Sequence, residues 1–223
     1  MRVCLRLRRL RLRLRGWRKI VFKRSPTSPT SDSQNGEFRR LFWQVDMTEI
    51  VFKPGHNTPP HLFMADWFYM LTGSTYKKQP LILSNNRKRE LVDALHVASE
   101  LYHWVIIAWV MMDNHYHAIL KSPQNNPGNL TKLVASYHKF TAHKWNNQDS
   151  LVGRKVWWNY WDTCIRSQED YLNRLRYVFW NPVKHGLVQN PAEYPYCNYA
   201  DFLEEDWFDI GKVPVEVKDV PEF

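Results

Sequence analysis

The feature that most constrains this chain is a run of apolar, partly β-branched residues interrupted by two histidines. The run covers residues 105–112 and resumes at 118, with His115 and His117 between. This pattern is typical of buried strand, either one long bent strand or two strands joined by a tight turn at 113–114. Side chains two residues apart on a strand point to the same face, so we expect the imidazoles side by side. Such a pair is two-thirds of a metal site, although a chain with nine histidines also produces one by chance.

The composition fits one globular domain. The chain has 223 residues, of which 44% are hydrophobic and 15% aromatic, which is enough for one sizeable core. Its apolar runs are shorter than the roughly 20 residues that span a bilayer, so we expect no membrane partner. The cysteines (Cys4, Cys164 and Cys197) form no Cys-x-x-Cys pair. That pattern excludes a zinc ribbon or a disulfide framework and favours a cytoplasmic protein.

The formal net charge of +9 is unevenly distributed. Residues 1–24 contain eleven basic residues and no acidic ones, whereas residues 201–223 contain eight acidic residues and two lysines. The segment 25–37 has the Ser, Thr and Pro content of a disordered linker. We therefore expect a basic, disordered extension and linker (1–37), a folded domain (38–200) and an acidic tail (201–223). The extension is either an arm that binds phosphate backbones or a low-complexity stretch upstream of the natural start.

The remaining patterns predict an α+β fold, with a single compact sheet and helices packed on it. A first core strand is expected at 66–72, a short one is considered at 81–83, and residues 157–165 form an aromatic strand or an irregular segment. Ser84 and Ser167 have the positions of N-caps. Helices are expected at 84–102, from 129 or 131 to 146, and at 169–181, where Pro182 and Gly186 end the last one.

The last predicted helix carries a second pair of chemically useful side chains. Tyr177 and Asn181 are four residues apart, so a phenol and a carboxamide lie on one helix face, one turn apart. A carboxamide oxygen is a metal ligand and a phenolic oxygen is a nucleophile. If this helix crosses the sheet over the histidines, the four residues form one complete unit. The alternative is structural: a core aromatic residue and a C-cap before a proline.

These residues together resemble a known family. His115-Tyr-His117 after an apolar strand resembles the HUH motif of single-tyrosine transposases, in which two histidines flank a bulky apolar residue. The run Leu175-Arg-Tyr-Val-Phe-Trp-Asn-Pro-Val-Lys-His-Gly-Leu-Val188 is similar to the signature of the REP-associated tyrosine transposase branch. Further matches are Gly153, Trp157, Asp162 and Tyr194-Pro-Tyr196. The resemblance covers roughly residues 63–199 and leaves out both tails.

The resemblance implies a ferredoxin- or RRM-like HUH fold with a central antiparallel sheet. It implies that His115, His117 and Asn181 bind a divalent cation, Mg²⁺ or Mn²⁺. Tyr177 would then attack a phosphodiester of single-stranded DNA, leaving a 5′-phosphotyrosine and a free 3′-hydroxyl. The implied function is a DNA endonuclease and strand transferase, acting as a monomer or homodimer on single-stranded or hairpin DNA of palindromic repeat elements. Such a protein would work in the cytoplasm, at the bacterial nucleoid.

Other side chains extend or qualify this hypothesis. Asp113 stands where family members commonly have proline, which adds a negative charge near the expected metal, and Trp180 is bulkier than is usual there. Four aromatic residues (Trp157, Trp158, Tyr160 and Trp161) either stack on unpaired bases or belong to the core. Candidates for contact with the DNA backbone, unless they are merely solvated, are Arg174, Arg176, Lys184 and His185.

Two other function classes remain open on the sequence. One is a domesticated DNA-binding protein that keeps the fold but not transposition. The other is an unrelated metal hydrolase, which needs a general base near the metal; Asp113 is the local candidate. The hydrolase hypothesis leaves the spacing of Tyr177 and Asn181 unexplained.

Overall fold

The structure is a computed structural model that describes residues 51–55, 58–203, 209–211, 214 and 217. The expected extension at 1–37 and most of the expected tail lie outside these residues, so the domain boundaries stay predictions. Among the helices that the structure describes, none is both long and apolar enough to cross a membrane.

A four-stranded antiparallel sheet forms the centre of the described fold. Its strands are β3 (Phe68–Thr75), β4 (Val105–Met111), β5 (His115–Lys121) and β6 (Trp157–Cys164), in the spatial order β4-β5-β3-β6. A separate antiparallel pair is formed by β1 (Val51–Gly55) and β2 (Thr58–Phe63). The expected α+β class with a central antiparallel sheet is therefore confirmed.

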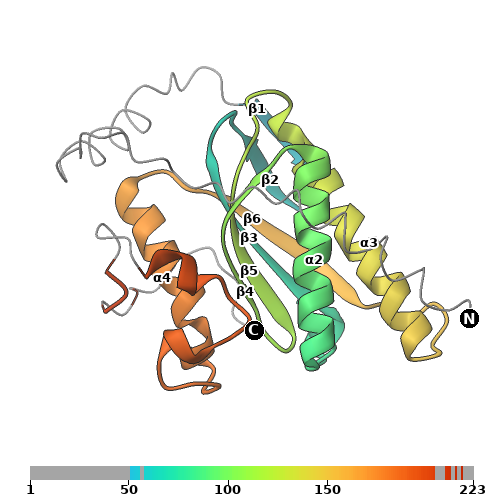
Figure 1. The fold of residues 1–223 in the computed structure, drawn as a ribbon. Helices are drawn as coiled ribbons and strands as arrows, with labels where there is room; N and C mark the ends of the chain where they lie inside the picture. Colours follow the sequence, from blue (N-terminus) through green and yellow to red (C-terminus); the bar gives the residue numbers. More distant parts are fainter. Residues whose placement is uncertain (1–50, 56–57, 204–208, 212–213, 215–216, 218–223) are drawn as a thin grey trace, which may run out of the picture. The chain divides into compact units, whose positions relative to one another are not determined.

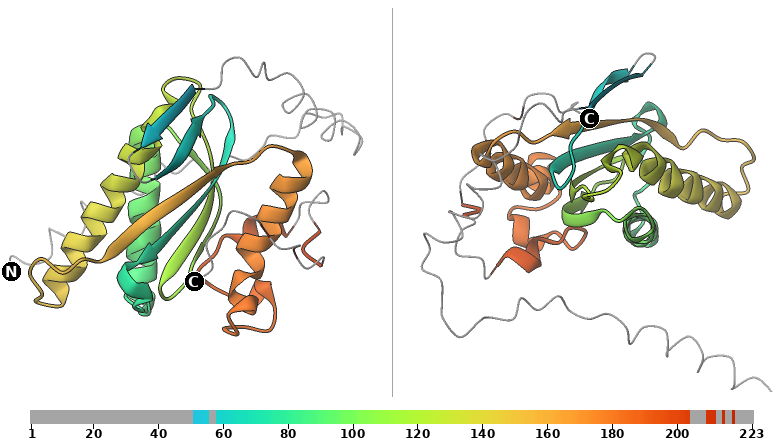
Figure 2. Two further views of the ribbon diagram at one scale, coloured as in Figure 1. Left: turned by 180° about the vertical axis from the view of Figure 1, so that it is seen from behind. Right: turned by 90° about the horizontal axis from the view of Figure 1, so that it is seen from above.

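Helices cover both faces of this sheet. The helices α2 (Asn85–Tyr102) and α3 (Leu130–Gln148) pack on one face, and α4 (Gln168–Lys184) crosses the other (Figures 1 and 2). Along β5, Tyr116, Ala118 and Leu120 join the core under α2 and α3, whereas Ile119 joins the core under α4. Single-turn 3₁₀ helices lie at Tyr76–Lys78 (η3), Pro127–Asn129 (η4), Pro191–Glu193 (η5) and Tyr199–Phe202 (η6).

The segment that carries the histidines is a hairpin, which is one of the two forms that the sequence predicts. β4 ends at Met111 and β5 begins at His115, and Met112 N donates a hydrogen bond to His115 O at 2.8 Å across the turn. The single long strand is wrong. The short strand considered at 81–83 is also wrong, because this segment is a turn in which Leu83 N donates to Pro80 O and only Ile82 is deeply buried.

Both predicted N-caps are present, but the predicted end of the last helix is wrong. Ser84 accepts a hydrogen bond from Arg87 N at 3.3 Å, and Ser167 accepts one from Asp170 N at 3.1 Å. Pro182 lies inside α4, which continues to Lys184 and is followed by Gly186 at φ +68°. A proline removes its own backbone donor, and its ring crowds the carbonyl four residues earlier. The helical pattern resumes after it, with His185 N donating to Asn181 O at 3.0 Å.

Candidate active site

The two histidines of β5 lie side by side in the interior. His115 is 1% exposed and His117 is 0% exposed, and their ring centroids are 5.0 Å apart. Both side chains point to the face covered by α4, because Tyr116 between them points into the core under α2 and α3. The period of two along a strand therefore produces the paired imidazoles that the sequence predicts.

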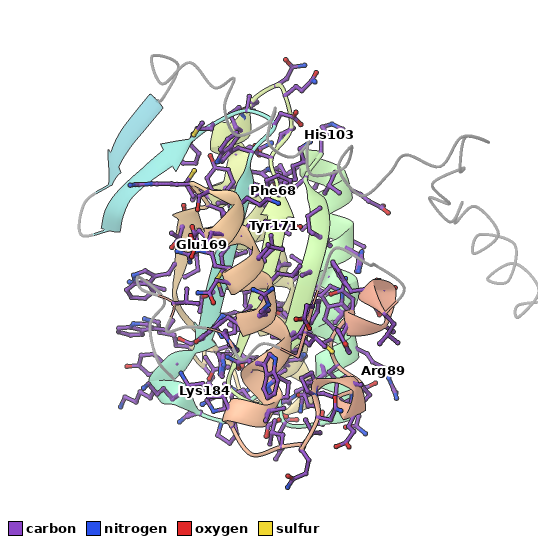
Figure 3. All side chains as sticks on the ribbon, turned by 90° about the vertical axis from the view of Figure 1, so that its left-hand side faces the viewer. Phe68, Arg89, His103, Glu169, Tyr171 and Lys184 are labelled. Carbon is purple, nitrogen blue, oxygen red and sulfur yellow. The ribbon has the colours of Figure 1, made fainter. Side chains whose placement is uncertain are left out.

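The helix α4 brings Tyr177 and Asn181 onto this pair. Asn181 Oδ1 lies 3.1 Å from His115 Nε2, and the Tyr177 ring centroid lies 5.2 Å from that of His117. Figure 3 looks onto α4, which runs across the sheet from Glu169 at one end to Lys184 at the other. Asn181 is buried and is not the C-cap of the helix, a position that His185 occupies. The structure thus assembles all four side chains within one chain.

In each imidazole, the hydrogen bond at Nδ1 determines whether Nε2, which faces the site, carries a proton or a lone pair. His115 Nδ1 lies 2.7 Å from Asn114 Oδ1, while Asn114 Nδ2 donates to Lys78 O at 3.2 Å. An amide oxygen only accepts, so Nδ1 of His115 carries the proton and Nε2 presents a lone pair. His117 Nδ1 lies 2.9 Å from Thr72 Oγ1 on the neighbouring strand. The hydroxyl can accept in the same way, which leaves Nε2 of His117 as a second inward-facing lone pair.

Sequence reasoning missed both of these supporting residues. Asn114 had a usable signal, because a carboxamide directly before a histidine can reach its Nδ1. Thr72 had none, since its position opposite His117 follows from the pairing of β3 with β5.

Burial keeps both imidazoles neutral. Loss of hydration, helped by the positive charges of His185 and Lys184, lowers the pKa of His115 to about 3. Burial, together with the neighbouring His115, likewise holds the pKa of His117 well below its usual value. A neutral imidazole with its lone pair turned inward is the form that binds metal ions.

The ligand atoms of His115, His117 and Asn181 that face one another fit a divalent cation. His117 Nε2 is buried and has no hydrogen-bond partner among the residues that the structure describes, and the same is true of Asn181 Nδ2. His115 Nε2 faces Asn181 Oδ1, which brings two lone-pair atoms together. A cation bound by these three side chains would take a lone pair from each Nε2 atom and from Asn181 Oδ1. Without a cation, we would expect the Asn181 amide in the flipped orientation, in which its nitrogen donates a hydrogen bond to His115 Nε2. Within the described residues no three His, Cys, Asp or Glu side chains are placed to hold a metal. A cation bound by the two imidazoles would therefore take the amide oxygen of Asn181 as its third protein ligand.

Of the four side chains expected to contact the DNA backbone, two lie beside this site. The His185 ring centroid is 5.0 Å from that of His115, and Lys184 Nζ lies 5.6 Å from the Tyr177 ring centroid. Both side chains are exposed. Arg174 is only 4% exposed and donates to Asp170 Oδ1 at 2.7 Å, and Arg176 Nε donates to Asp209 O at 2.8 Å. Arg174 and Arg176 are thus held by contacts within the protein, whereas Lys184 and His185 lie exposed beside the site.

The two departures from the family pattern are accommodated locally. The carboxylate of Asp113 forms an ion pair with Lys88 of α2, a lysine that is itself buried. This pairing compensates the extra negative charge and occupies the one group that the hydrolase hypothesis offers as a base. Trp180 is half-buried and donates from Nε1 to Ile210 O at 2.8 Å, so its bulk is packed against the C-terminal segment.

Comparison with known proteins gives relatives of one kind. No family model matches the chain. A curated protein of Haemophilus influenzae, assigned by its name provisionally to the REP-associated tyrosine transposases, is 25% identical over 147 residues, which are 57% of this chain and 84% of that protein. The Escherichia coli REP-associated tyrosine transposase is 28% identical over 96 residues, or 42% of this chain and 53% of that protein.

A solved structure shares the fold. It is a REP-associated tyrosine transposase bound to a REP hairpin, with a TM-score of 0.56 and 19% sequence identity over 75% of this chain and 95% of the other. The chain is a homologue of the REP-associated tyrosine transposases and has their fold.

Proposed function

We propose that this chain is a metal-dependent tyrosine transposase that cuts single-stranded DNA and joins the cut end to another strand. The observation that carries the proposal is the convergence of Tyr177 and Asn181 of α4 on the two buried histidines of β5. The names of the sequence relatives support transposition. The hairpin bound to the structural neighbour supports single-stranded or hairpin DNA, such as that of palindromic repeat elements, as the substrate.

The reaction begins with a phosphodiester placed between Tyr177 and the two imidazoles. A Mg²⁺ or Mn²⁺ ion held by His115, His117 and Asn181 would withdraw charge from the phosphorus and stabilise the oxygen that leaves. Tyr177 Oη attacks the phosphorus, and the bond from phosphorus to the 3′ oxygen of the DNA breaks. The phenolic proton is lost and the 3′ oxygen takes one up, so the products are a 5′-phosphotyrosine and a 3′-hydroxyl. Attack by another 3′-hydroxyl reverses these steps and needs no nucleotide cofactor.

The other residues of the site orient the imidazoles or attract the phosphate. Thr72 and Asn114 hold the two imidazoles in the required direction. Lys184 and His185 place positive charge where the phosphate would enter. Because the nucleophile and the ligands come from one chain, a monomer has a complete site and a homodimer would carry two. Such an enzyme would act in the cytoplasm, on DNA of the nucleoid.

A labelled, hairpin-bearing single-stranded DNA incubated with Mn²⁺ tests this proposal. We expect a covalent protein–DNA adduct on a denaturing gel, lost in Tyr177→Phe and retained in Tyr171→Phe, a buried tyrosine of the same helix. Metal-dependent cleavage that survives in Tyr177→Phe would contradict the proposal. Hairpin binding without any adduct in the wild-type protein would instead support the domesticated DNA-binding protein.

A further inference from the structure

An exposed cluster of aromatic rings and lysines lies where β3 ends and β6 begins. The ring centroids of Tyr76 and Trp158 are 5.3 Å apart. Lys155 Nζ lies over both rings, 4.1 Å from the Trp158 centroid and 4.8 Å from that of Tyr76. Lys77 Nζ lies 5.5 Å from the Tyr76 centroid. These four residues are called the stacking cluster below.

The stacking cluster is accessible and carries uncompensated positive charge. Trp158 is 46% exposed, although the neighbouring Trp157 is buried in the core. Lys77 and Lys155 are exposed and form no ion pair with any residue that the structure describes. Within the aromatic segment of β6, Trp157 therefore belongs to the core, whereas the ring of Trp158 is accessible to a ligand.

Asn114 connects the η3 turn, which carries Tyr76 and Lys77, to the active site. Asn114 donates from Nδ2 to Lys78 O in the η3 turn and accepts at Oδ1 from His115. Across the sheet, Ser74 pairs with His115 and Thr75 pairs with Trp157. His115 and the start of β6 are thus two strand spacings apart, roughly 10 Å. Trp157 points under α2 and α3. The pairing of β6 with β3 shifts register between Trp157 and Tyr160, so Trp158 lies at a bulge of the strand.

We propose that the stacking cluster binds an unpaired nucleotide of single-stranded DNA beside the phosphate that the active site cuts. The base would stack on Trp158 and Tyr76, in the place that the Lys155 ammonium now takes over the same rings. Lys155 and Lys77 would then pair with the neighbouring phosphates. Every base has a π-face, so this contact holds the strand without reading its sequence. A paired base inside a duplex cannot present that face, so the cluster selects single strands.

This inference rests on the proposed function for its place in the reaction, but its test is a binding measurement that needs no catalysis. Fluorescence anisotropy in EDTA would compare a labelled twelve-residue thymidine oligonucleotide with an abasic strand of equal length and charge. The protein would be the full chain with Trp158→Ala, with Trp158→Phe, or unchanged. Phe140→Ala is a matched control, because Phe140 is an exposed aromatic residue with a lysine over its ring, on α3.

We expect the wild-type protein to bind the thymidine strand roughly ten-fold more tightly than the abasic strand. Trp158→Ala should remove this preference while binding of the abasic strand is unchanged, and Trp158→Phe and Phe140→Ala should keep it. Lys155→Ala should weaken both strands and lower the salt dependence of binding.

Equal binding of the two strands by the wild-type protein would overturn the inference, as would a preference that survives in Trp158→Ala. The outcome is distinguishable from failure of the proposed function. If the preference exists but no Tyr177 adduct forms, the cluster binds unpaired bases and the catalytic assignment fails. If the adduct forms but the preference is absent, the catalytic assignment stands and the stacking cluster does not bind unpaired bases.

Discussion

His115 Nε2 and Asn181 Oδ1 lie 3.1 Å apart, although 66 positions separate the two residues in the chain. The contact joins the second strand of the β4–β5 hairpin to the helix that crosses it. Neither atom has a proton to offer the other while Asn114 holds the proton on His115 Nδ1. A pair of lone-pair atoms at this distance is poorly suited to stability alone, and it is well suited to sharing a cation.

Replacing Asn181 by leucine should separate stability from metal binding. The amide nitrogen of Asn181 is buried without a partner in the described part of the chain, and such a group costs about 1–3 kcal/mol. Asn181→Leu should therefore raise the free energy of unfolding in EDTA by roughly 1 kcal/mol, while the Mn²⁺-dependent increase in melting temperature disappears. Differential scanning calorimetry with and without Mn²⁺ measures both effects. A variant that is less stable in EDTA and still responds to Mn²⁺ would refute the assignment of this ligand.

Thr72 should matter for metal affinity without touching the metal. Its hydroxyl lies against His117 Nδ1, and outer partners of this kind typically affect metal affinity ten- to a hundred-fold. We expect Thr72→Val to weaken Mn²⁺ binding by about ten-fold in calorimetric titration, with little change in melting temperature in EDTA. Thr72→Ser keeps the hydroxyl and should restore the affinity. Equal affinities for the valine and serine variants would show that this hydroxyl does not orient the imidazole.

His138 predicts how stability depends on pH. Burial lowers the pKa of His138 from its usual 6.5 to about 3, and its ring stacks on Trp157 with centroids 4.2 Å apart. Below pH 6.5 the unfolded chain binds a proton at this residue that the folded chain does not, so stability falls as pH falls from 6.5 toward 3. Between pH 6.5 and pH 5 the loss is on the order of 2 kcal/mol.

Urea unfolding at several pH values checks this expectation. His138→Gln should remove this contribution, because the glutamine does not titrate, and leave the contributions of His115 and His117, whose pKa values are also lowered by burial. His143→Gln is the control, since His143 lies on the same helix and half-exposed. A pH dependence as steep in His138→Gln as in the wild-type protein would assign the loss to other groups.

Gly73 should tolerate no side chain. A Cβ there would collide with the Tyr116 ring, whose hydroxyl is held by Tyr137 and His138. Overpacking of this kind costs about 1–3 kcal/mol, so Gly73→Ala should lower the free energy of unfolding by that amount. Because Tyr116 lies between the two histidines, Mn²⁺ affinity should fall as well. Adding Tyr116→Leu should recover part of the loss, and strictly additive effects in the double variant would contradict the proposed collision.

Local rules predicted most of the elements of the fold. Ser84 and Ser167 cap their helices as their residue types suggest, and the apolar run around the histidines forms buried strands. Local rules failed at Pro182, which lies inside the last turn of α4, where the packing of the helix on the sheet offsets the lost hydrogen bond and the crowding that a proline causes. They also failed at 81–83, where an apolar segment that resembles a short strand is a turn with one buried isoleucine.

The sequence by itself determined which side chains share a face. A period of two places His115 beside His117, and a period of 3.6 places Tyr177 beside Asn181, because these spacings are properties of the strand and the helix. Only the tertiary structure decided that the two pairs meet, that Thr72 and Asn114 orient the imidazoles, and that Arg174 is buried rather than available to DNA. These relations depend on strand order, on register and on which face a helix covers. Such contacts join residues far apart in the chain, and no local pattern records them.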